Sequence, residues 1–375
     1  MIATLLLMIT STTELLEAVN RAVMLWATRL FPVLFPFYIL GVLFIKFGVA
    51  HFIGGLLSPI TRLLFNTKPL GGFVFLISLL SGNPQSAVMI SELYQNRELT
   101  KFEAEHLLKF CVFTNPLFCI GTVGMIYFQN ITVGYIVLIA HVLSNIILGV
   151  LLRFQIKNSD SVNLSIKNTY QSMVNNKSKE TMGEILTTII QKGLNVMFLV
   201  CGFMIFFNIL IELLTKSQII AGIYHLTTFI PFISIPYDVF YANFMAIFEL
   251  TTAVDAISKT KLDLRFIVTF MTIFISFGGL SIHAQIHSIL DKVKIRYLPF
   301  LLYRVYQMVI SGLLAFYLFP LLYKEKTKST WNILKPLPEK NMILFSIFIL
   351  ILLVIFLNRH KLKILWPTEH KKKLN

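Results

Sequence analysis

Apolar stretches long enough to cross a membrane constrain the fold of this chain more than any other feature of its sequence. They lie at residues 26–47, 131–152, 194–214, 266–290, 298–323 and 342–357. An α-helix needs about 20 mostly apolar residues to cross the hydrocarbon core of a bilayer. Of the 375 residues, 56% are hydrophobic and only 14% are charged, against about 25% charged in soluble domains. The sequence therefore predicts an all-α polytopic membrane protein and excludes an ordinary soluble enzyme.

Four apolar segments are interrupted near their centres by Gly, Pro or polar residues. They are 71–94, 103–128, 238–258 and 265–290, with breaks at Ser81-Gly82-Asn83-Pro84, Thr114-Asn115-Pro116, Glu249-Leu250-Thr251-Thr252 and Ser276-Phe277-Gly278-Gly279. Lipid cannot satisfy the backbone of a broken helix, so such breaks are tolerated only inside protein or beside a water-filled cavity. The segments follow the same order in both halves. We therefore predict two inverted repeats, each with a re-entrant hairpin (71–94, 238–258) and a broken transmembrane helix (103–128, 265–290). The plainer alternative is a set of Pro kinks in packed helices.

The predicted organisation has five parts. They are an N-terminal segment (1–21), a first membrane repeat (22–152), a polar cytoplasmic linker (153–192), a second repeat (193–323), and a C-terminal extra span with a basic tail (324–375). If the hairpins return to the side they enter from, each repeat has three crossings, and an odd number inverts the second repeat. The side that carries 46–109, the linker, 292–296 and the tail holds 21 of the 33 Lys and Arg residues. Positive residues concentrate on the cytoplasmic side, so we assign this side to the cytoplasm.

The breaks also predict a binding site. In each Asn-Pro pair the Asn side chain can cap a half-helix and the Pro can occupy its first position. Free N–H groups and a partial positive charge at such an end attract a carboxylate or a phosphate. Glu249 is a costly intramembrane carboxylate, which either binds a coupling cation, a proton or a substrate donor, or serves as a structural partner. The candidate substrate-binding residues are Ser81, Gly82, Asn83, Gln85, Ser86, Thr114, Asn115, Glu249, Thr251, Thr252, Ser276, Gly278, Gly279, Ser281 and Gln285.

Other kinds of site have little support. His283 and His287 have a helical i,i+4 spacing but no third ligand, so we predict no metal site. We predict no catalytic residues and no cofactor. Whether a cation or a proton is coupled to transport is left undecided by the sequence. The net charge of +15 comes without aromatic residues interleaved in a basic patch, so nucleic acid is not an expected partner. We interpret the stretch around Glu103 to His106 as a solvated helix face. Arg304 could meet a lipid headgroup, a substrate carboxylate or Glu212.

Several segments together resemble a known family. They are GGFVFLISLLSGNPQSA (71–87), KFEAEHLLKFCVFTNPLFCIGTVGMIYFQN (101–130), ISFGGLSIHAQIHSIL (275–290) and PFLLYRVYQ (299–307). They resemble the YlbJ family of sporulation integral membrane proteins, which carry the nucleoside-recognition (Gate) domain. The resemblance implies export of dipicolinic acid from the mother cell across the outer forespore membrane. It also implies a layout similar to that of the concentrative nucleoside transporters. The extension over 330–375 is not part of the resemblance.

Three functions follow, from two different classes. The leading interpretation is a multi-pass membrane transporter of a small organic anion, with dipicolinate as the substrate. The first alternative is a cation-coupled transporter of nucleosides or other solutes, because Glu249 and its polar neighbours suit an uncharged ligand as well. The second is a non-transporting protein of spore-envelope assembly, in which the linker and the basic tail would be the working parts. We do not expect the protein to be an enzyme. Its expected partners are a lipid bilayer and a small anionic substrate. By analogy with other transporters, a homo-oligomer is also considered.

Overall fold

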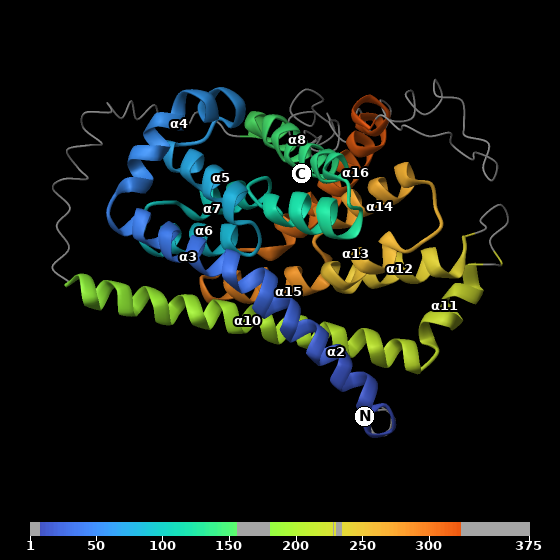
Figure 1. Cartoon of the computed structure of the whole chain (residues 1–375). Coiled ribbons are helices and arrows are strands. Elements are labelled where there is room, and N and C mark those ends of the chain that lie inside the picture. The colour runs from blue at the N-terminus through green and yellow to red at the C-terminus, as the bar shows by residue number, and fades with distance from the viewer. Residues whose placement is uncertain (1–7, 156–180, 228, 230–234, 324–375) are drawn as a thin grey trace, which may run out of the picture.

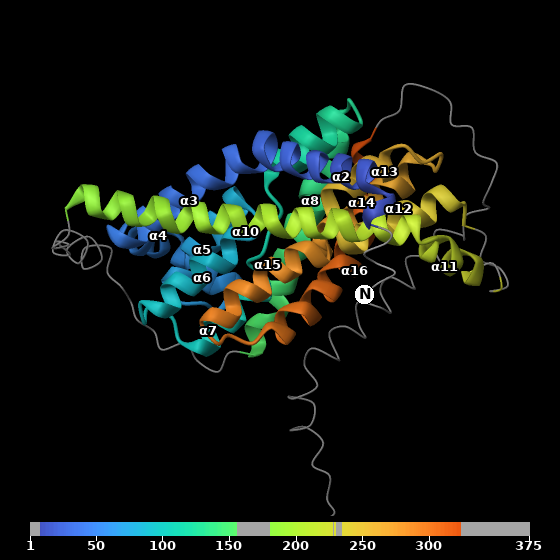
Figure 2. The same cartoon turned by 90° about the horizontal axis from the view of Figure 1, so that it is seen from below.

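Helices joined by short connections make up the described part of the protein (Figure 1). The structure is a computed structural model that describes residues 8–155, 181–227, 229 and 235–323. No strand occurs in these ranges. Helices α4 to α7 gather at one end of the molecule and α11 to α14 at the other, and the long helix α10 runs along both groups (Figures 1 and 2).

The helix bounds divide into two series. The first half contains α2 (Thr12–Leu25), the π-helical turn η1 (Trp26–Leu30), α3 (Phe31–Lys46), α4 (Val49–Phe65), α5 (Pro69–Ser81), α6 (Gln85–Gln95), α7 (Lys101–Leu108), the π-helix η2 (Phe118–Tyr127), α8 (Ile131–Leu152) and η3 (Arg153–Gln155). The second half contains α10 (Met182–Lys216), α11 (Ile219–Thr227), α12 (Tyr237–Phe248), α13 (Leu250–Ser258), α14 (Leu264–Phe277), α15 (Gly279–Lys292) and α16 (Tyr297–Leu322).

Five helical stretches within the described ranges are long and apolar enough to cross a membrane. They are Thr12–Lys46, Ile131–Gln155, Met182–Lys216, Leu264–Lys292 and Tyr297–Leu322. The pair α4 and α5 also passes the test as one span, although it bends by 92° at the break between them. Large apolar side chains such as Leu63, Phe198 and Phe206 are more than half exposed, as expected of a surface that faces lipid. The fold is therefore that of an all-α polytopic membrane protein, as the sequence predicts.

All four predicted interruptions are breaks between helices. Residues 82–84 separate α5 from α6, and Cys111–Asn115 form a non-helical segment between α7 and the helix that leads into η2. In the second half, Glu249 separates α12 from α13, and Gly278 separates α14 from α15. Gly278 and Gly279 both have positive φ, which glycine adopts without steric cost. Each segment is therefore interrupted at the predicted position, although α14 and α15 together still form one stretch long enough to span a membrane, Leu264–Lys292.

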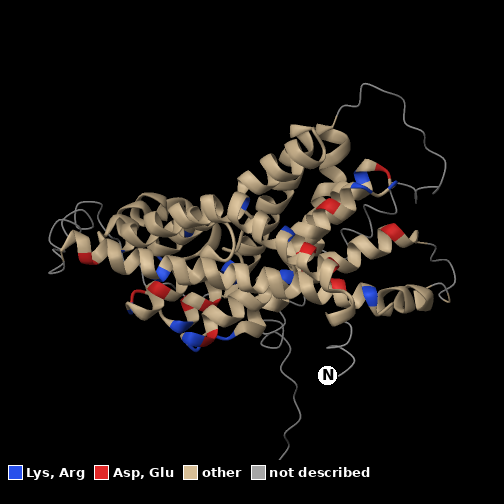
Figure 3. Cartoon of the chain, turned by 60° about the horizontal axis from the view of Figure 1, so that its bottom comes forward, with Lys and Arg blue, Asp and Glu red and all other residues tan. Residues whose placement is uncertain are grey.

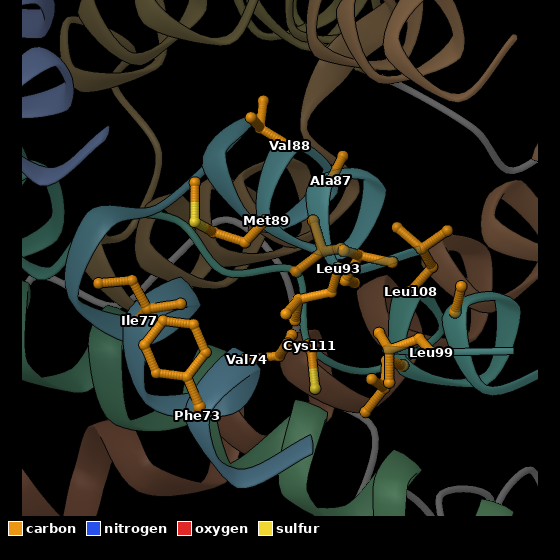
Figure 4. Packing of buried hydrophobic residues seen from close by; sticks show 14 of the residues in the cluster. Phe73, Val74, Ile77, Ala87, Val88, Met89, Leu93, Leu99, Leu108 and Cys111 are labelled. Carbon is orange, nitrogen blue, oxygen red and sulfur yellow. The ribbon is translucent and has the colours of Figure 1, made fainter. Parts of the chain in front are cut away.

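The first hairpin lies inside the protein (Figure 4). Phe73 and Ile77 of α5 and Met89 and Leu93 of α6 are at most 5% exposed. Around them, Leu99, Leu108 and Cys111 supply side chains from the chain that follows (Figure 4). Helix α6 buries residues on all its sides, which is typical of a core helix. The break between α5 and α6 is thus shielded from lipid by the protein around it.

Two helices begin earlier than the predicted boundaries. The first long helix begins at Thr12, although 1–21 was expected to be a separate segment. Leu15, Ala18 and Ala22 lie on one face of α2 and are buried, and α2 contacts α10, so tertiary packing extends the helix through a polar stretch. Helix α10 begins at Met182, inside the predicted linker.

The early start of α10 has a local cause. Thr181 and Glu184 form a capping box, in which each side chain accepts a hydrogen bond from the backbone N–H of the other residue. Ile185 and Ile189 follow at a helical spacing and are buried. The rest of the predicted linker, 156–180, and the C-terminal part, 324–375, lie outside the described residues.

Ion pairs join the three described regions that the sequence assigns to one side of the membrane. Lys68 contacts Glu103 at 2.7 Å, Lys192 contacts Glu92 at 3.2 Å, and Arg296 contacts Glu105. Figure 3 shows a cluster of Lys, Arg, Asp and Glu at one end of the molecule, with others spread along the rest of it. Residues from 46–109, 153–192 and 292–296 therefore meet at the same end of the structure.

The face of α7 that we interpreted as solvated is buried instead. Glu105 is 6% exposed and His106 is 2% exposed, because α7 packs against α6 and α16. His106 lies against the rings of Phe102 and Phe110. Burial lowers the pKa of His106 to about 3, so its imidazole is neutral at physiological pH.

We expect the Glu105 and Arg296 pair to make stability depend on pH. Hydrogen bonds from Arg296 lower the pKa of Glu105 below its ordinary value. Its contribution is therefore complete above the unfolded carboxyl pKa of about 4.3 and is lost as the pH falls through the lower folded pKa. Glu105→Gln should lower the melting temperature at pH 7, and the difference from the unmodified protein should shrink toward pH 3.5. A difference that stays constant over this range would contradict the prediction.

Candidate functional site

A cavity of about 70 Å³ lies where the breaks of the two halves meet. Its polar wall residues are Asn83, Thr114 and Asn115 from the first half and Glu249, Thr251, Ser281 and Gln285 from the second. Leu30 and Leu34 of the first long helix and Val200 and Met204 of α10 supply apolar wall. One water needs about 10–15 Å³ by this kind of measure, so the cavity has room for several. Seven of the fifteen candidate residues therefore line one space.

Asn115 connects the two breaks of the first half. Its Oδ1 accepts a hydrogen bond from the Leu117 N–H at 2.6 Å, and its Nδ2 donates to the carbonyl oxygens of Leu80 and Ser81 at 3.3 and 3.2 Å. The side chain thus caps the helix that restarts at Pro116, as predicted, and satisfies carbonyls at the end of α5. The hairpin tip and the broken helix are held together by this one amide.

Asn83 does not cap α6, so that prediction is wrong. The N-cap position belongs to Pro84, and the Asn83 side chain makes no bond to the first turn of the helix. The reason is a tight turn closed by the Gln85 N–H, which donates to the Gly82 carbonyl at 3.0 Å and leaves Asn83 within the turn. Asn83 instead faces the cavity, and its Oδ1 is buried without a hydrogen-bond partner in the described chain.

Two more candidate residues at the first turn of α6 are buried and unpaired. Gln85 and Ser86 are both 0% exposed. Three side-chain atoms have no hydrogen-bond partner within the described residues: the amide nitrogen and oxygen of Gln85 and the hydroxyl oxygen of Ser86. Buried polar atoms in native proteins nearly always have a partner, from protein, water or ligand. The first turn of α6 therefore carries unused hydrogen-bonding capacity beside Asn83.

Glu249 caps its own helix at the cavity wall. Its carboxylate accepts hydrogen bonds from the N–H groups of Thr251 at 3.1 Å and Thr252 at 2.7 Å, and from the Thr251 hydroxyl at 2.6 Å. Glu249 is 3% exposed. A carboxylate at a helix N-terminus is stabilised by the amides and the dipole. The positive end of α13 is thus already occupied by an internal anion.

The other candidate residues lie behind the wall. Ser81 donates to the Ile77 carbonyl, and Thr252 donates to the Asn208 side chain. Gly82 touches Asn115 so closely that an added Cβ would lie 2.7 Å from the Asn115 nitrogen. Gly278 and Gly279 form the break before α15, and Gly279 lies against carbonyls at the end of α12.

The breaks of the two halves also bond to each other. The Thr114 hydroxyl donates to the Ile275 carbonyl at 3.2 Å, in the last turn of α14. His141 Nε2 accepts from the Thr114 N–H at 2.9 Å, and its Nδ1 lies 2.8 Å from the Ser276 hydroxyl. Because Nε2 accepts, a neutral imidazole must carry its proton on Nδ1 and donate it to Ser276. His141 therefore links the two breaks from behind the cavity.

Sequence reasoning missed His141 and the polar residues around it. The segments that carry them, 131–152 and 298–323, read as uninterrupted spans. A signal was present in the helical spacing of polar residues within them, His141 with Asn145 and Arg304 with Gln307 and Ser311. All five are at most 1% exposed, so they face the protein interior.

Glu212, one of the partners considered for Arg304, pairs with Arg21 instead, and Arg304 binds oxygen atoms of the chain itself. Its guanidinium donates to the carbonyls of Val112 at 2.8 Å and Lys109 at 3.2 Å, and to the Asn145 side chain at 3.2 Å. These carbonyls follow α7, where the helix ends and leaves them without intrahelical donors. Arg304 therefore supports the non-helical segment that carries Thr114 and Asn115. Within the described residues, no group of three His, Cys, Asp or Glu side chains could hold a metal ion.

Comparison with known proteins identifies a relative. The chain is 29% identical to the sporulation integral membrane protein YlbJ of Bacillus subtilis (strain 168) over an alignment of 318 residues. This alignment covers 82% of this chain and 78% of the relative. No family model matches the chain, and no solved structure matches it significantly. The relative is an integral membrane protein, and the described part of this chain has five helices long and apolar enough to span a bilayer. The similarity supports an assignment to the YlbJ family, and the chain is a multi-pass integral membrane protein.

Proposed function

We propose that the protein is a transporter that moves a small organic anion through the cavity between its two halves. The observation that carries the proposal is the meeting of the helix breaks at one polar cavity. Breaks at membrane depth, in corresponding positions of two halves, are the usual construction of a substrate site in secondary transporters. Transport also accounts for the placement of seven candidate residues, from distant parts of the chain, around a single space.

Asn83 lines the cavity and leads into the part of the chain best suited to an anion, the first turn of α6. This turn combines the partial positive charge of a helix N-terminus with the unpaired side chains of Gln85 and Ser86, which are fully buried and do not line the cavity in this structure. These groups offer donors without the desolvation cost of a buried lysine. Dipicolinate, a flat ring with two carboxylates, matches them, and we propose it as the substrate.

The name of the relative supports a setting for the proposed transport. YlbJ is named a sporulation integral membrane protein. We propose that this chain exports dipicolinic acid from the mother cell across the outer forespore membrane.

We further propose that the two halves are inverted repeats of the concentrative nucleoside transporter kind. In support, each half has a long helix, a short helix, two interrupted segments and a final span, in that order. The ends of the first hairpin also lie together: Lys68 precedes α5, and its partner Glu103 follows α6. A hairpin that leaves at the end where it entered is re-entrant.

Glu249 favours a second candidate, a cation-coupled carrier of nucleosides or other uncharged solutes. Its carboxylate lies at the cavity, where it would repel an anion at close range and attract a cation or a hydroxyl donor. The N–H groups of Thr251 and Thr252 weaken this objection, because the partial positive charge of the helix end reduces the repulsion between this carboxylate and an anion.

Uptake into proteoliposomes decides between these functions. We expect radiolabelled dipicolinate to accumulate above the level of protein-free vesicles, and uridine not to accumulate. Uridine uptake that requires a sodium or proton gradient, without dipicolinate uptake, would establish the second candidate. If neither solute moves in vesicles that contain folded protein, the assembly function replaces transport.

We expect Glu249→Gln to reduce the transport rate about tenfold or more. A glutamine has one acceptor oxygen, so it leaves at least one of the Thr251 and Thr252 amides unpaired beside the cavity. Glu103→Gln is the matched control. Glu103 also serves a helix N-terminus, in a capping box with Thr100, but it does not line the cavity. We expect less than a twofold change for the control, and equal effects would remove Glu249 from the site.

A further inference from the structure

Arg304 is a buried cation without a carboxylate partner in the described part of the chain. It is 1% exposed, and none of the ion pairs among these residues includes it. Its Nη atoms donate only to backbone carbonyls and to the Asn145 amide oxygen. A charge inside a membrane protein is costly when it is not paired, and such residues are generally functional. A neutral hydrogen-bond donor could bind the same three oxygens, so these bonds alone do not explain why a charged side chain lies here.

The guanidinium is connected to the first-half wall of the cavity through Val112 and Asn145. Val112, which accepts its shortest hydrogen bond, is two residues before Thr114, or about 7 Å along a non-helical chain. Asn145 is one helical turn from His141, which accepts the Thr114 N–H. Arg304 is thus linked to Thr114, which lines the cavity, by two routes: through Val112 along the chain, and through Asn145 and His141.

The cavity therefore has two electrically different walls. Connected to the first-half wall is an arginine, which keeps its charge in proteins. On the second-half wall lies the carboxylate of Glu249, which accepts hydrogen bonds from the N-terminus of α13 and from the Thr251 hydroxyl. Inside a protein, charges are screened far less than in water, so a fixed cation several ångströms away still favours an anion.

We propose that Arg304 determines the charge selectivity of the cavity. Its uncompensated positive charge makes the first-half wall prefer a dicarboxylate to an uncharged ligand of the same shape. This inference rests on the proposed function, since it names the residue that selects the anion. It assigns Arg304 a role beyond holding the segment after α7.

The experiment compares dipicolinate with its uncharged analogue pyridine-2,6-dicarboxamide, both measured by binding to the purified full-length protein. In the unmodified protein we expect dipicolinate to bind more tightly. Arg304→Gln should weaken dipicolinate binding at least tenfold and change diamide binding less than twofold. Arg304→Lys should keep the preference, because it keeps the charge. A residue with a structural role alone would weaken both ligands together.

Asn145→Asp tests the same charge without removing the arginine. The new carboxylate would stand where the Asn145 Oδ1 now lies 3.2 Å from Arg304, so the cation would gain a counter-ion. The substitution also removes the hydrogen bonds that Asn145 Nδ2 donates to the carbonyls of Val112 and His141 at 3.4 Å. We expect the preference for dipicolinate to disappear. This variant decides the matter if Arg304→Gln does not fold.

Arg265→Gln is the control, because Arg265 also lies in a membrane-spanning helix but contacts Phe316, away from the cavity. It should leave the preference intact. A preference that survives in both Arg304→Gln and Asn145→Asp would overturn the inference and leave the proposed function standing. An unmodified protein that binds neither ligand would overturn both.

Discussion

Gly82→Ala is expected to abolish transport and to destabilise the protein by about 3 kcal/mol or more. Gly82 has φ +80° and ψ −169°, a backbone conformation that is essentially restricted to glycine and costs other residues about 1–3 kcal/mol. An added Cβ would also lie 2.7 Å from the backbone nitrogen of Asn115 and 2.8 Å from its Cβ. The three nearest atoms all belong to Asn115 and two of them are backbone atoms, so no flexible group can move aside and the hairpin tip must separate from the broken helix. Melting in detergent and dipicolinate uptake measure the two effects.

Gly202→Ala is the matched control. Gly202 lies inside α10, has no positive φ, and has open space where a Cβ would be placed. Alanine is the better helix former, so we expect unchanged transport and equal or slightly higher stability. A Gly82→Ala protein that melts and transports like the control would show that the contact between the two breaks is not required.

Asn115→Ala is expected to have the second largest effect, at least a tenfold loss of transport with a loss of about 2 kcal/mol in stability. The substitution removes a helix cap, which is worth about 1 kcal/mol. It also leaves the carbonyls of Leu80 and Ser81 without the donors they now have. Beyond this cost, it removes an amide from the cavity wall.

Asn130→Ala separates the cap from the site. Asn130 caps α8 through the Thr132 N–H at 3.0 Å, a bond of the same kind, but it does not line the cavity. We expect a similar loss of cap energy with transport rates within twofold of the unmodified protein. If Asn115→Ala and Asn130→Ala reduce transport equally, Asn115 acts through stability alone.

The breaks were predictable because Gly, Pro and polar residues interrupt apolar runs that would otherwise be continuous. Asn115 followed by Pro116 specified its own cap, and the structure confirms it. Glu249 carried a similar local signal, since Thr251 and Thr252 follow it at the positions whose N–H groups a cap binds. A break is thus a local property of the sequence, and local signals were enough to place it.

Packing between distant segments was not predictable in the same way. Asn83 has the same Asn-Pro sequence as Asn115, yet it sits in a tight turn that the local pattern does not distinguish from a cap. His141 reaches Thr114 and Ser276 only because three segments meet. The first helix extends back to Thr12 because α10 covers its face. In each case the deciding partner is far away in the sequence.

The length of α10 limits how the two halves can move. Its 35 residues span about 52 Å, whereas the bilayer core is about 30 Å thick, so it must cross steeply inclined or project beyond the core. It touches α2 and α3 of one half and α12 and α15 of the other (Figure 2). If one half moves against the other, it must slide along α10 or bend it. Alternating access in this protein would therefore be a sliding of one half along α10 more than a hinge motion between the two halves.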